Sequence, residues 1–90
     1  MIVSVKDKRI ADGRMPKRFP QDLSKPARRA LNLIETAVAL DDLRSPPGNR
    51  LEALKGDRAG QHSIRVNDQW RICFRWLADG AHDVELVDYH

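Results

Sequence analysis

Two alternating runs separated by three residues constrain the fold of this 90-residue chain more than any other feature. In His62–Val66 and in Trp70–Trp76, branched or aromatic residues occupy every second position, the period of a β-strand with one buried face. A hairpin must place both apolar sets on one side, because a slip by one residue turns one set toward solvent. A loop of Asn67–Gln69 satisfies this requirement and predicts that Ile64 lies opposite Ile72.

The same register sets two arginines against each other. Arg65 falls opposite Arg71 on the outer face of the predicted sheet, where like charges cost on the order of 0.2–1 kcal/mol. A phosphate between the two guanidiniums would reverse the sign of that contribution. We therefore expect an anion site here, and the alternative is that the arginines point into water or pair with nearby acids. Arg75 is expected to be structural, because the next hairpin brings Asp83 and Glu85 close to it.

A second hairpin is predicted to turn through Ala78–Gly80 and to return along the C-terminal strand. Strand parity places Tyr89 on the face that carries the arginines. The same parity places Asp88 and His90 on the opposite side, where fraying of the last residues can turn them to either face.

The first 40 residues supply the helical part of the prediction. Met1–Val5 is β-branched and predicts a first strand, Lys6–Arg14 predicts a short helix, and Met15–Pro20 predicts a linker. A longer helix is predicted from a Ser24 cap through about Leu40, with its apolar stripe packed on the sheet. That stripe consists of Leu23, Ala27, Ala30, Leu31, Ile34 and Val38.

Charge and cysteine content narrow the classes of function. The formal net charge is +3, but Arg44–Arg75 holds seven basic and three acidic residues, and the chain from Trp76 onward holds four acids and neither Lys nor Arg. This asymmetry favours a localised anion-binding patch in a single domain, residues 1–90. One cysteine, Cys73, excludes an intrachain disulfide. We see no metal or cofactor motif, signal peptide or membrane span, and expect a cytoplasmic protein whose chemistry uses side chains alone.

Two motifs carry a resemblance to a known family. Residues 45–76 read S-P-P-G-N-R-L-E-A-L-K-G-D-R-A-G-Q-H-S-I-R-V-N-D-Q-W-R-I-C-F-R-W, and the chain ends V-E-L-V-D-Y-H. Together they resemble the HigB-type toxins of the RelE/ParE toxin superfamily, also called plasmid maintenance system killer proteins, and the similarity extends over Leu31–His90. The resemblance implies an α+β, RelE-like fold in which two N-terminal helices pack on one face of a small antiparallel sheet.

The resemblance also implies a function. Toxins similar to this chain enter the ribosomal A site and cleave mRNA, and a HigA-type antitoxin with a helix-turn-helix neutralises them. The implied partners are that antitoxin, the ribosome and mRNA, with operator DNA bound only through the toxin–antitoxin complex and no membrane. No cofactor and no metal are implied.

The chemistry of metal-free RNA cleavage assigns roles to the basic residues. The 2′-hydroxyl must lose its proton, the pentavalent phosphate must be stabilised, and the leaving 5′-oxygen must be protonated. Arg71 and Lys55 suit the second role, because preorganised cations stabilise charge that develops in the transition state. Arg65 and Arg58 are expected to hold flanking phosphates.

The terminal motif supplies the proton chemistry. His90 is the natural proton carrier, because an unperturbed histidine has a pKa of about 6.5. We expect Tyr89 to orient the scissile phosphate or stack on a base, and Asp88 to position His90 or a ribose hydroxyl.

Glu52 departs from the family pattern, because some HigB toxins carry a histidine at this position that acts with the C-terminal motif. Three readings follow: Glu52 acts as base or positioner, His62 substitutes from the next strand, or activity is weak. The core-side parity of His62 favours a structural role for it. Two other classes of function stay open, a ParE-like gyrase inhibitor without catalytic residues and a non-catalytic RNA- or protein-binding module.

Overall fold

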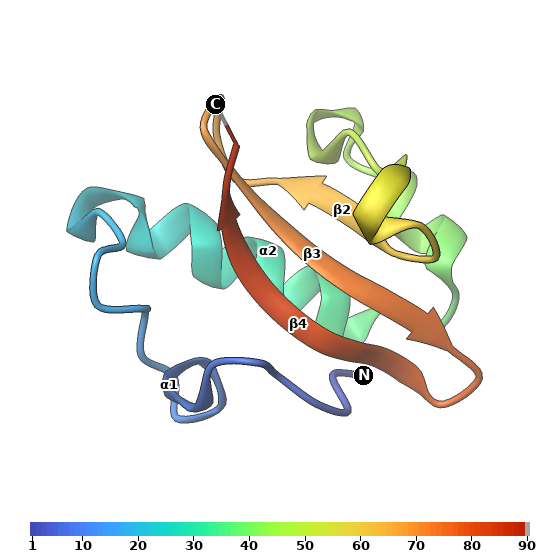
Figure 1. Cartoon of the computed structure of the whole chain (residues 1–90), viewed down its shortest axis with the longest axis horizontal. Coiled ribbons are helices and arrows are strands. Elements are labelled where there is room, and N and C mark those ends of the chain that lie inside the picture. Colours follow the sequence, from blue (N-terminus) through green and yellow to red (C-terminus); the bar gives the residue numbers. More distant parts are fainter. Residues whose placement is uncertain (90) are drawn as a thin grey trace.

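A computed structural model describes residues 1–89 and shows a four-stranded antiparallel sheet with one long helix across one face (Figure 1). The strands lie in the order β1-β2-β3-β4, and four short 3₁₀ turns connect the elements. The strands are β1 (Glu52–Ala53), β2 (His62–Arg65), β3 (Trp70–Leu77) and β4 (Gly80–Asp88), and the helices are α1 (Lys8–Ala11) and α2 (Ser24–Thr36). The predicted α+β class is confirmed.

The first hairpin has the predicted register. Ile64 lies opposite Ile72, and Arg65 lies opposite Arg71. The loop closes because the Asn67 side-chain oxygen accepts hydrogen bonds from two backbone N–H groups, those of Gln69 at 3.0 Å and Trp70 at 2.7 Å. Asparagine is favoured in turns for this local bond.

The second hairpin departs from the prediction at its turn. The loop has two residues, Ala78 and Asp79, rather than the predicted three, so Leu77 lies opposite Gly80. A bulge then sets Asp83 and Val84 against one residue of β3, and Asp83 adopts a left-handed backbone with φ 54°. The extra residue compensates for the shorter turn, so the register beyond the bulge is the predicted one.

The predicted strand at Met1–Val5 does not form as a regular strand. The segment nevertheless runs along the edge of β4. Two isolated parallel bridges join Ile2 to Ala81 and Val5 to Val84. Between them, the bulge turns the Asp83 N–H toward the Ser4 hydroxyl, to which it donates at 2.9 Å. The ladder is therefore interrupted where β4 itself is irregular.

The long helix is shorter than predicted at its C-terminal end. Ser24 is the first helical residue instead of the cap, and the helix stops at Thr36 instead of continuing to about Leu40. The Asp42 carboxylate accepts from the backbone N–H groups of Val38 and Ala39 at 2.9 and 3.0 Å, which turns the chain away from the helix axis. Val38 is consequently 91% exposed, so its place in the predicted stripe was wrong.

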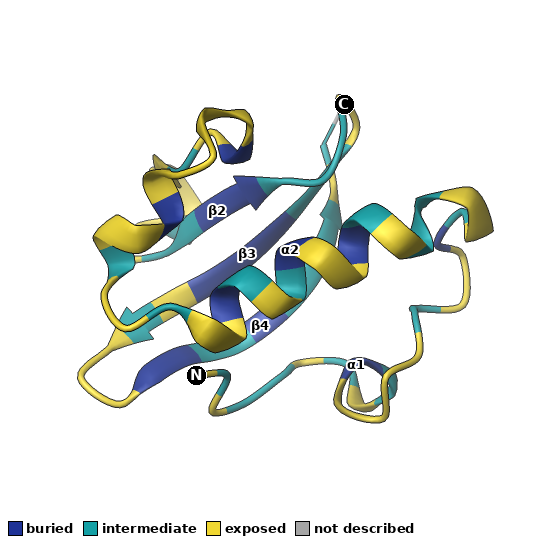
Figure 2. Ribbon diagram, turned by 180° about the vertical axis from the view of Figure 1, so that it is seen from behind, coloured by how far each residue is buried: buried dark blue, intermediate teal, exposed yellow. Residues whose placement is uncertain are grey.

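The predicted N-terminal helix forms only one turn. Of Lys6–Arg14, only α1 is helical, and it lies on the β4 side of the molecule, apart from the sheet, while α2 alone lies across the sheet (Figures 1 and 2). Asp7 caps this turn by accepting from the Arg9 N–H at 2.9 Å. Ile10 is its one buried residue, which is too little apolar surface to extend it.

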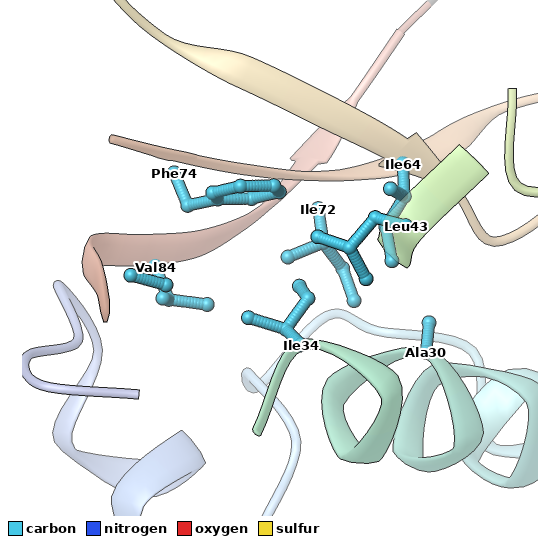
Figure 3. Packing of buried hydrophobic residues seen from close by; sticks show 8 residues of the cluster. Ala30, Ile34, Leu43, Ile64, Ile72, Phe74 and Val84 are labelled. Carbon is cyan, nitrogen blue, oxygen red and sulfur yellow. The ribbon is translucent and has the colours of Figure 1, made fainter. Parts of the chain in front are cut away.

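The core lies between α2 and the inner face of the sheet (Figure 3). Ile34 of α2 is fully buried, as are Ile64, Ile72 and Phe74 of the strands. The remaining buried members of the cluster are Ala30, Leu43, Ala81 and Val84. Within residues 1–89, we find no helix with the length and apolar character needed to cross a membrane.

Replacing Ile34 with alanine should lower the free energy of unfolding by about 2–5 kcal/mol, because the substitution leaves a cavity beneath the sheet. Val38→Ala is the matched control, since its exposed side chain should change the free energy by less than about 0.5 kcal/mol. Urea denaturation followed by circular dichroism measures both. Equal losses in the two variants would contradict the burial of Ile34 and the exposure of Val38.

Candidate active site

The face of the sheet opposite α2 carries a continuous row of polar residues. Glu52 lies opposite Ser63, Ser63 opposite Cys73, and Cys73 opposite Glu85. Directly opposed residues in an antiparallel sheet project to the same side, so all four side chains belong to one surface. We call this side of the sheet the outer face.

Arg71 is held by acceptors from two segments, β2 and the loop before β1. Its Nε donates to the Ser63 hydroxyl at 2.7 Å, and its Nη2 donates to the Arg50 carbonyl at 2.6 Å. Nη2 also approaches the Ser63 carbonyl at 3.4 Å. The guanidinium is therefore fixed at two of its three nitrogens.

The Arg65–Arg71 opposition exists as predicted, but each guanidinium has its own partners. Arg65 pairs with Asp68 in the hairpin loop, and Arg71 reaches toward β2 and Arg50. The structure therefore shows Arg65 paired with a nearby acid, which is the alternative that the sequence offered to a phosphate shared with Arg71. A phosphate bound between the two arginines stays a prediction.

The loop before β1 presents the Arg50 carbonyl. Buried Asn49 donates through Nδ2 to the carbonyls of Leu43 at 3.2 Å and Ser45 at 3.3 Å, which anchors the Pro47–Asn49 turn. Arg50 follows in a left-handed conformation with φ 46° and ψ 56°. This unusual backbone geometry directs its carbonyl at Arg71.

Arg58 reaches the outer face from the 3₁₀ turn Gly56–Arg58, in front of the sheet in Figure 1. Its Nη1 lies 3.3 Å from Glu85 Oε2 and 3.0 Å from Gln61 Oε1. Burial lowers the pKa of Arg58, but the hydrogen bond and charge of Glu85 outweigh it, so the net pKa is raised. Glu85 Oε2 also lies 3.0 Å from Lys6 Nζ. Glu85 therefore offsets part of the positive charge of this predicted phosphate-binding residue.

Tyr89 lies on the outer face, as predicted from parity. Its hydroxyl is 3.9 Å from Cys73 Sγ. Burial, followed by the hydrogen bond to Cys73, raises the pKa of the Tyr89 hydroxyl, which stays protonated at neutral pH. Burial also raises the pKa of the Cys73 thiol, against the Tyr89 hydrogen bond and the positive charges of Arg58 and Arg71. These side chains thus converge around Cys73.

The remaining predicted residues lie around this cluster. Glu52 and Lys55 are exposed, with Glu52 opposite Ser63 and Lys55 at the start of the 3₁₀ turn. Asp88 lies opposite Trp70 and accepts from Gln69 Nε2 at 3.2 Å. His90 lies outside the described residues.

His62 lies on the other side of the sheet from Arg71. It stands opposite Phe74, and the two rings stack with centroids 6.5 Å apart. Its Nδ1 is buried and has no hydrogen-bond partner among the described residues. The geometry therefore does not support His62 as a substitute for the catalytic histidine that some HigB toxins have at the position of Glu52. It supports a structural role for His62.

Two contributors to the site were missed from the sequence. Strand alternation already places Ser63 on the face of Arg71, so register was a signal that could have found it. The Arg50 carbonyl had no such signal, because its direction depends on a left-handed residue after the Pro47–Asn49 turn. Among residues 1–89, no group of three or more His, Cys, Asp or Glu side chains is placed to hold a metal ion.

Comparison with known proteins now decides the family. Residues 7–90 match the HigB-like toxins, described as the RelE-like toxin of the type II toxin-antitoxin system HigB. The chain belongs to this family. It is 37% identical over 94 residues to Toxin HigB-1 of Vibrio cholerae serotype O1, a match that covers 100% of this chain and 98% of that toxin. The family resemblance drawn from the sequence is confirmed.

Two further comparisons add a relative and a fold. The chain is 38% identical over 60 residues to Endoribonuclease HigB of Proteus vulgaris, across 67% of this chain and 64% of that protein. It also matches a chain of the YoeB-YefM complex from Staphylococcus aureus with a TM-score of 0.64, covering 100% of this chain and 95% of that one. At 17% identity, this structural likeness supports the fold alone.

Cys73 should react slowly with iodoacetamide in the folded protein. Its thiol is fully buried and its pKa is raised, so at a given pH less of it is the reactive thiolate than for a free cysteine. Mass spectrometry should show alkylation accelerating when urea unfolds the chain, and Cys73→Ala is the control that takes up no label. Rapid labelling of folded protein would contradict this burial.

Proposed function

We propose that this type II toxin is a ribosome-dependent endoribonuclease that cleaves mRNA without a metal ion. The proposal rests on the fixed guanidinium of Arg71, which lies on the same face of the sheet as the carboxylate of Glu52. Ser63 is hydrogen-bonded to Arg71 and lies opposite Glu52. The relative from Proteus vulgaris that is named an endoribonuclease supports RNA as the substrate class.

The fixed cation suits the most demanding step of RNA cleavage. Attack by the 2′-hydroxyl adds negative charge to the phosphate, and a donor already in place stabilises this charge without reorganising. Arg71 takes this role. Lys55, Arg58 and Arg65 serve as contacts for flanking phosphates, which bind largely through charge.

Proton transfer is divided among the remaining residues. Glu52 accepts the proton of the 2′-hydroxyl, and His90 donates a proton to the leaving 5′-oxygen, so Glu52 serves where some HigB toxins have histidine. Tyr89 remains protonated and donates a hydrogen bond to the scissile phosphate or stacks on a base. Asp88 positions His90 or a ribose hydroxyl.

The proposed partners are an antitoxin, the ribosome and mRNA. Membership of a toxin–antitoxin family supports an antitoxin partner, and we propose that it is of the HigA type and carries the operator-binding helix-turn-helix. The substrate is mRNA in the ribosomal A site. The toxin accordingly acts in the cytoplasm, where ribosomes translate.

Purified toxin should cleave a defined mRNA on programmed ribosomes, and Arg71→Ala should slow cleavage by about 10²–10³-fold because a transition-state donor is lost. His90→Gln should slow it by about 10²–10⁴-fold through loss of the general acid. Arg75→Ala is the matched control, since Arg75 is exposed and its Nε is paired with Asp83 at 2.9 Å. Gel analysis of end-labelled mRNA measures the rates.

Other outcomes of this assay separate the alternative functions. Wild-type protein that binds ribosomes but leaves the mRNA whole would support a non-catalytic binding module, and poisoning of gyrase would support a ParE-like toxin. A 2′-deoxy nucleotide at the cleavage site should abolish cutting, because the attacking hydroxyl is missing. Continued cutting of that mRNA would indicate attack by water and refute the 2′-hydroxyl mechanism.

Glu52→Gln should lower the cleavage rate by about 10²–10⁴-fold, as expected for loss of a general base. His62→Gln should leave the rate near that of wild type, because His62 projects to the other side of the sheet. Thermal melting of both variants controls for stability. The reverse pattern, with Glu52→Gln active and His62→Gln inactive, would assign the base to His62.

A further inference from the structure

Ser63 is a buried polar residue on the outer face, where we propose that neighbouring side chains contact the substrate. Its exposed fraction is 0%, and its side chain points to the outer face rather than to the apolar core. Buried hydroxyl groups are almost always hydrogen-bonded. Here the hydroxyl oxygen accepts from Nε of Arg71 at 2.7 Å.

We propose that Ser63 is a positioning residue, which together with the Arg50 carbonyl sets the direction in which Arg71 meets the scissile phosphate. This inference rests on the proposed nuclease function. The two acceptors lie on different segments, one on β2 and one in the loop before β1. Their bonds to Nε and Nη2 define the plane of the guanidinium.

The third nitrogen of the Arg71 guanidinium, Nη1, is the one available to substrate. Within residues 1–89, no hydrogen bond or ion pair engages Nη1 of Arg71. Because the guanidinium is planar and rigid, fixing two nitrogens also fixes the direction of the N–H bonds on the third. Nη1 is thereby presented to a phosphate oxygen in one orientation.

Loss of the Ser63 hydroxyl should therefore affect the reaction more than binding. Without it, Arg71 keeps its charge and the bonds of Nη2 to the Arg50 and Ser63 carbonyls, but nothing holds Nε and the guanidinium can tilt about Nη2. Charge alone sustains RNA association, whereas stabilisation of the transition state requires alignment. If Ser63 only filled space in the sheet, its replacement would change stability but neither RNA association nor the alignment of Arg71.

The test is single-turnover mRNA cleavage on programmed ribosomes with Ser63→Ala. The rate at saturating toxin should fall by about 10–100-fold, as expected for a misplaced catalytic group, with little change in the half-saturating toxin concentration. Ser63→Thr restores the hydroxyl and should recover most of the rate. Ile64→Val, which changes the next residue of β2 on the core side, is the control for lost stability and should cleave like wild type.

A double variant separates positioning from a structural effect. In the Arg71→Ala background, Ser63→Ala should slow cleavage no further, because it acts through the missing arginine. Equal effects in both backgrounds would overturn the proposal. So would a wild-type rate in Ser63→Ala.

An NMR measurement distinguishes failure of this inference from failure of the proposed function. Exchange of the Arg71 Nε proton with water should be slow in wild type and in Ser63→Thr, and faster in Ser63→Ala. Ser63→Cys, which is close in size and a weak acceptor, repeats the comparison if the alanine variant does not fold. Unchanged exchange overturns the inference. The predicted exchange pattern in a protein that leaves mRNA whole would instead refute the nuclease function alone.

Discussion

The packing of Ile64 and Ile72 beneath α2 is the constraint on which the rest of the molecule depends. Both side chains are fully buried against Ile34, so the inner face of β2 and β3 admits one register. That register decides which residues face outward. The outer face is therefore a consequence of core packing, and its chemistry is held in place by an apolar contact on the other side of the sheet.

The three arginines of the outer face differ in the charge of their partners. Arg65 is paired with Asp68, Arg58 with Glu85, and Arg71 with neutral oxygens. A neutral acceptor orients a guanidinium without cancelling its charge. Of these three arginines, Arg71 is thus the one that combines a full positive charge with a defined direction, which is what stabilisation of a developing oxyanion requires.

Features governed by strand period were predictable from the sequence, and those governed by irregular backbone were not. Alternation was sufficient for the hairpin register and for placing Tyr89 and Arg71 on one face. The end of α2 at Thr36 depends on the Asp42 carboxylate capturing two N–H groups, and the orientation of Arg71 depends on a carbonyl of left-handed Arg50. Both depend on individual hydrogen bonds made by irregular segments, which no periodic pattern predicts.

The short turn at Ala78 and Asp79 is one residue shorter than predicted, and the bulge at Asp83 adds that residue back to β4. Because the two-residue turn and the additional residue offset each other, the chain between Leu77 and Val84 can gain a residue in one place and lose it in the other without altering the outer face. A relative with a three-residue turn would need no bulge. Paired insertions and deletions in this stretch are therefore neutral for the site, whereas a lone one exchanges the two faces of β4 along its C-terminal half.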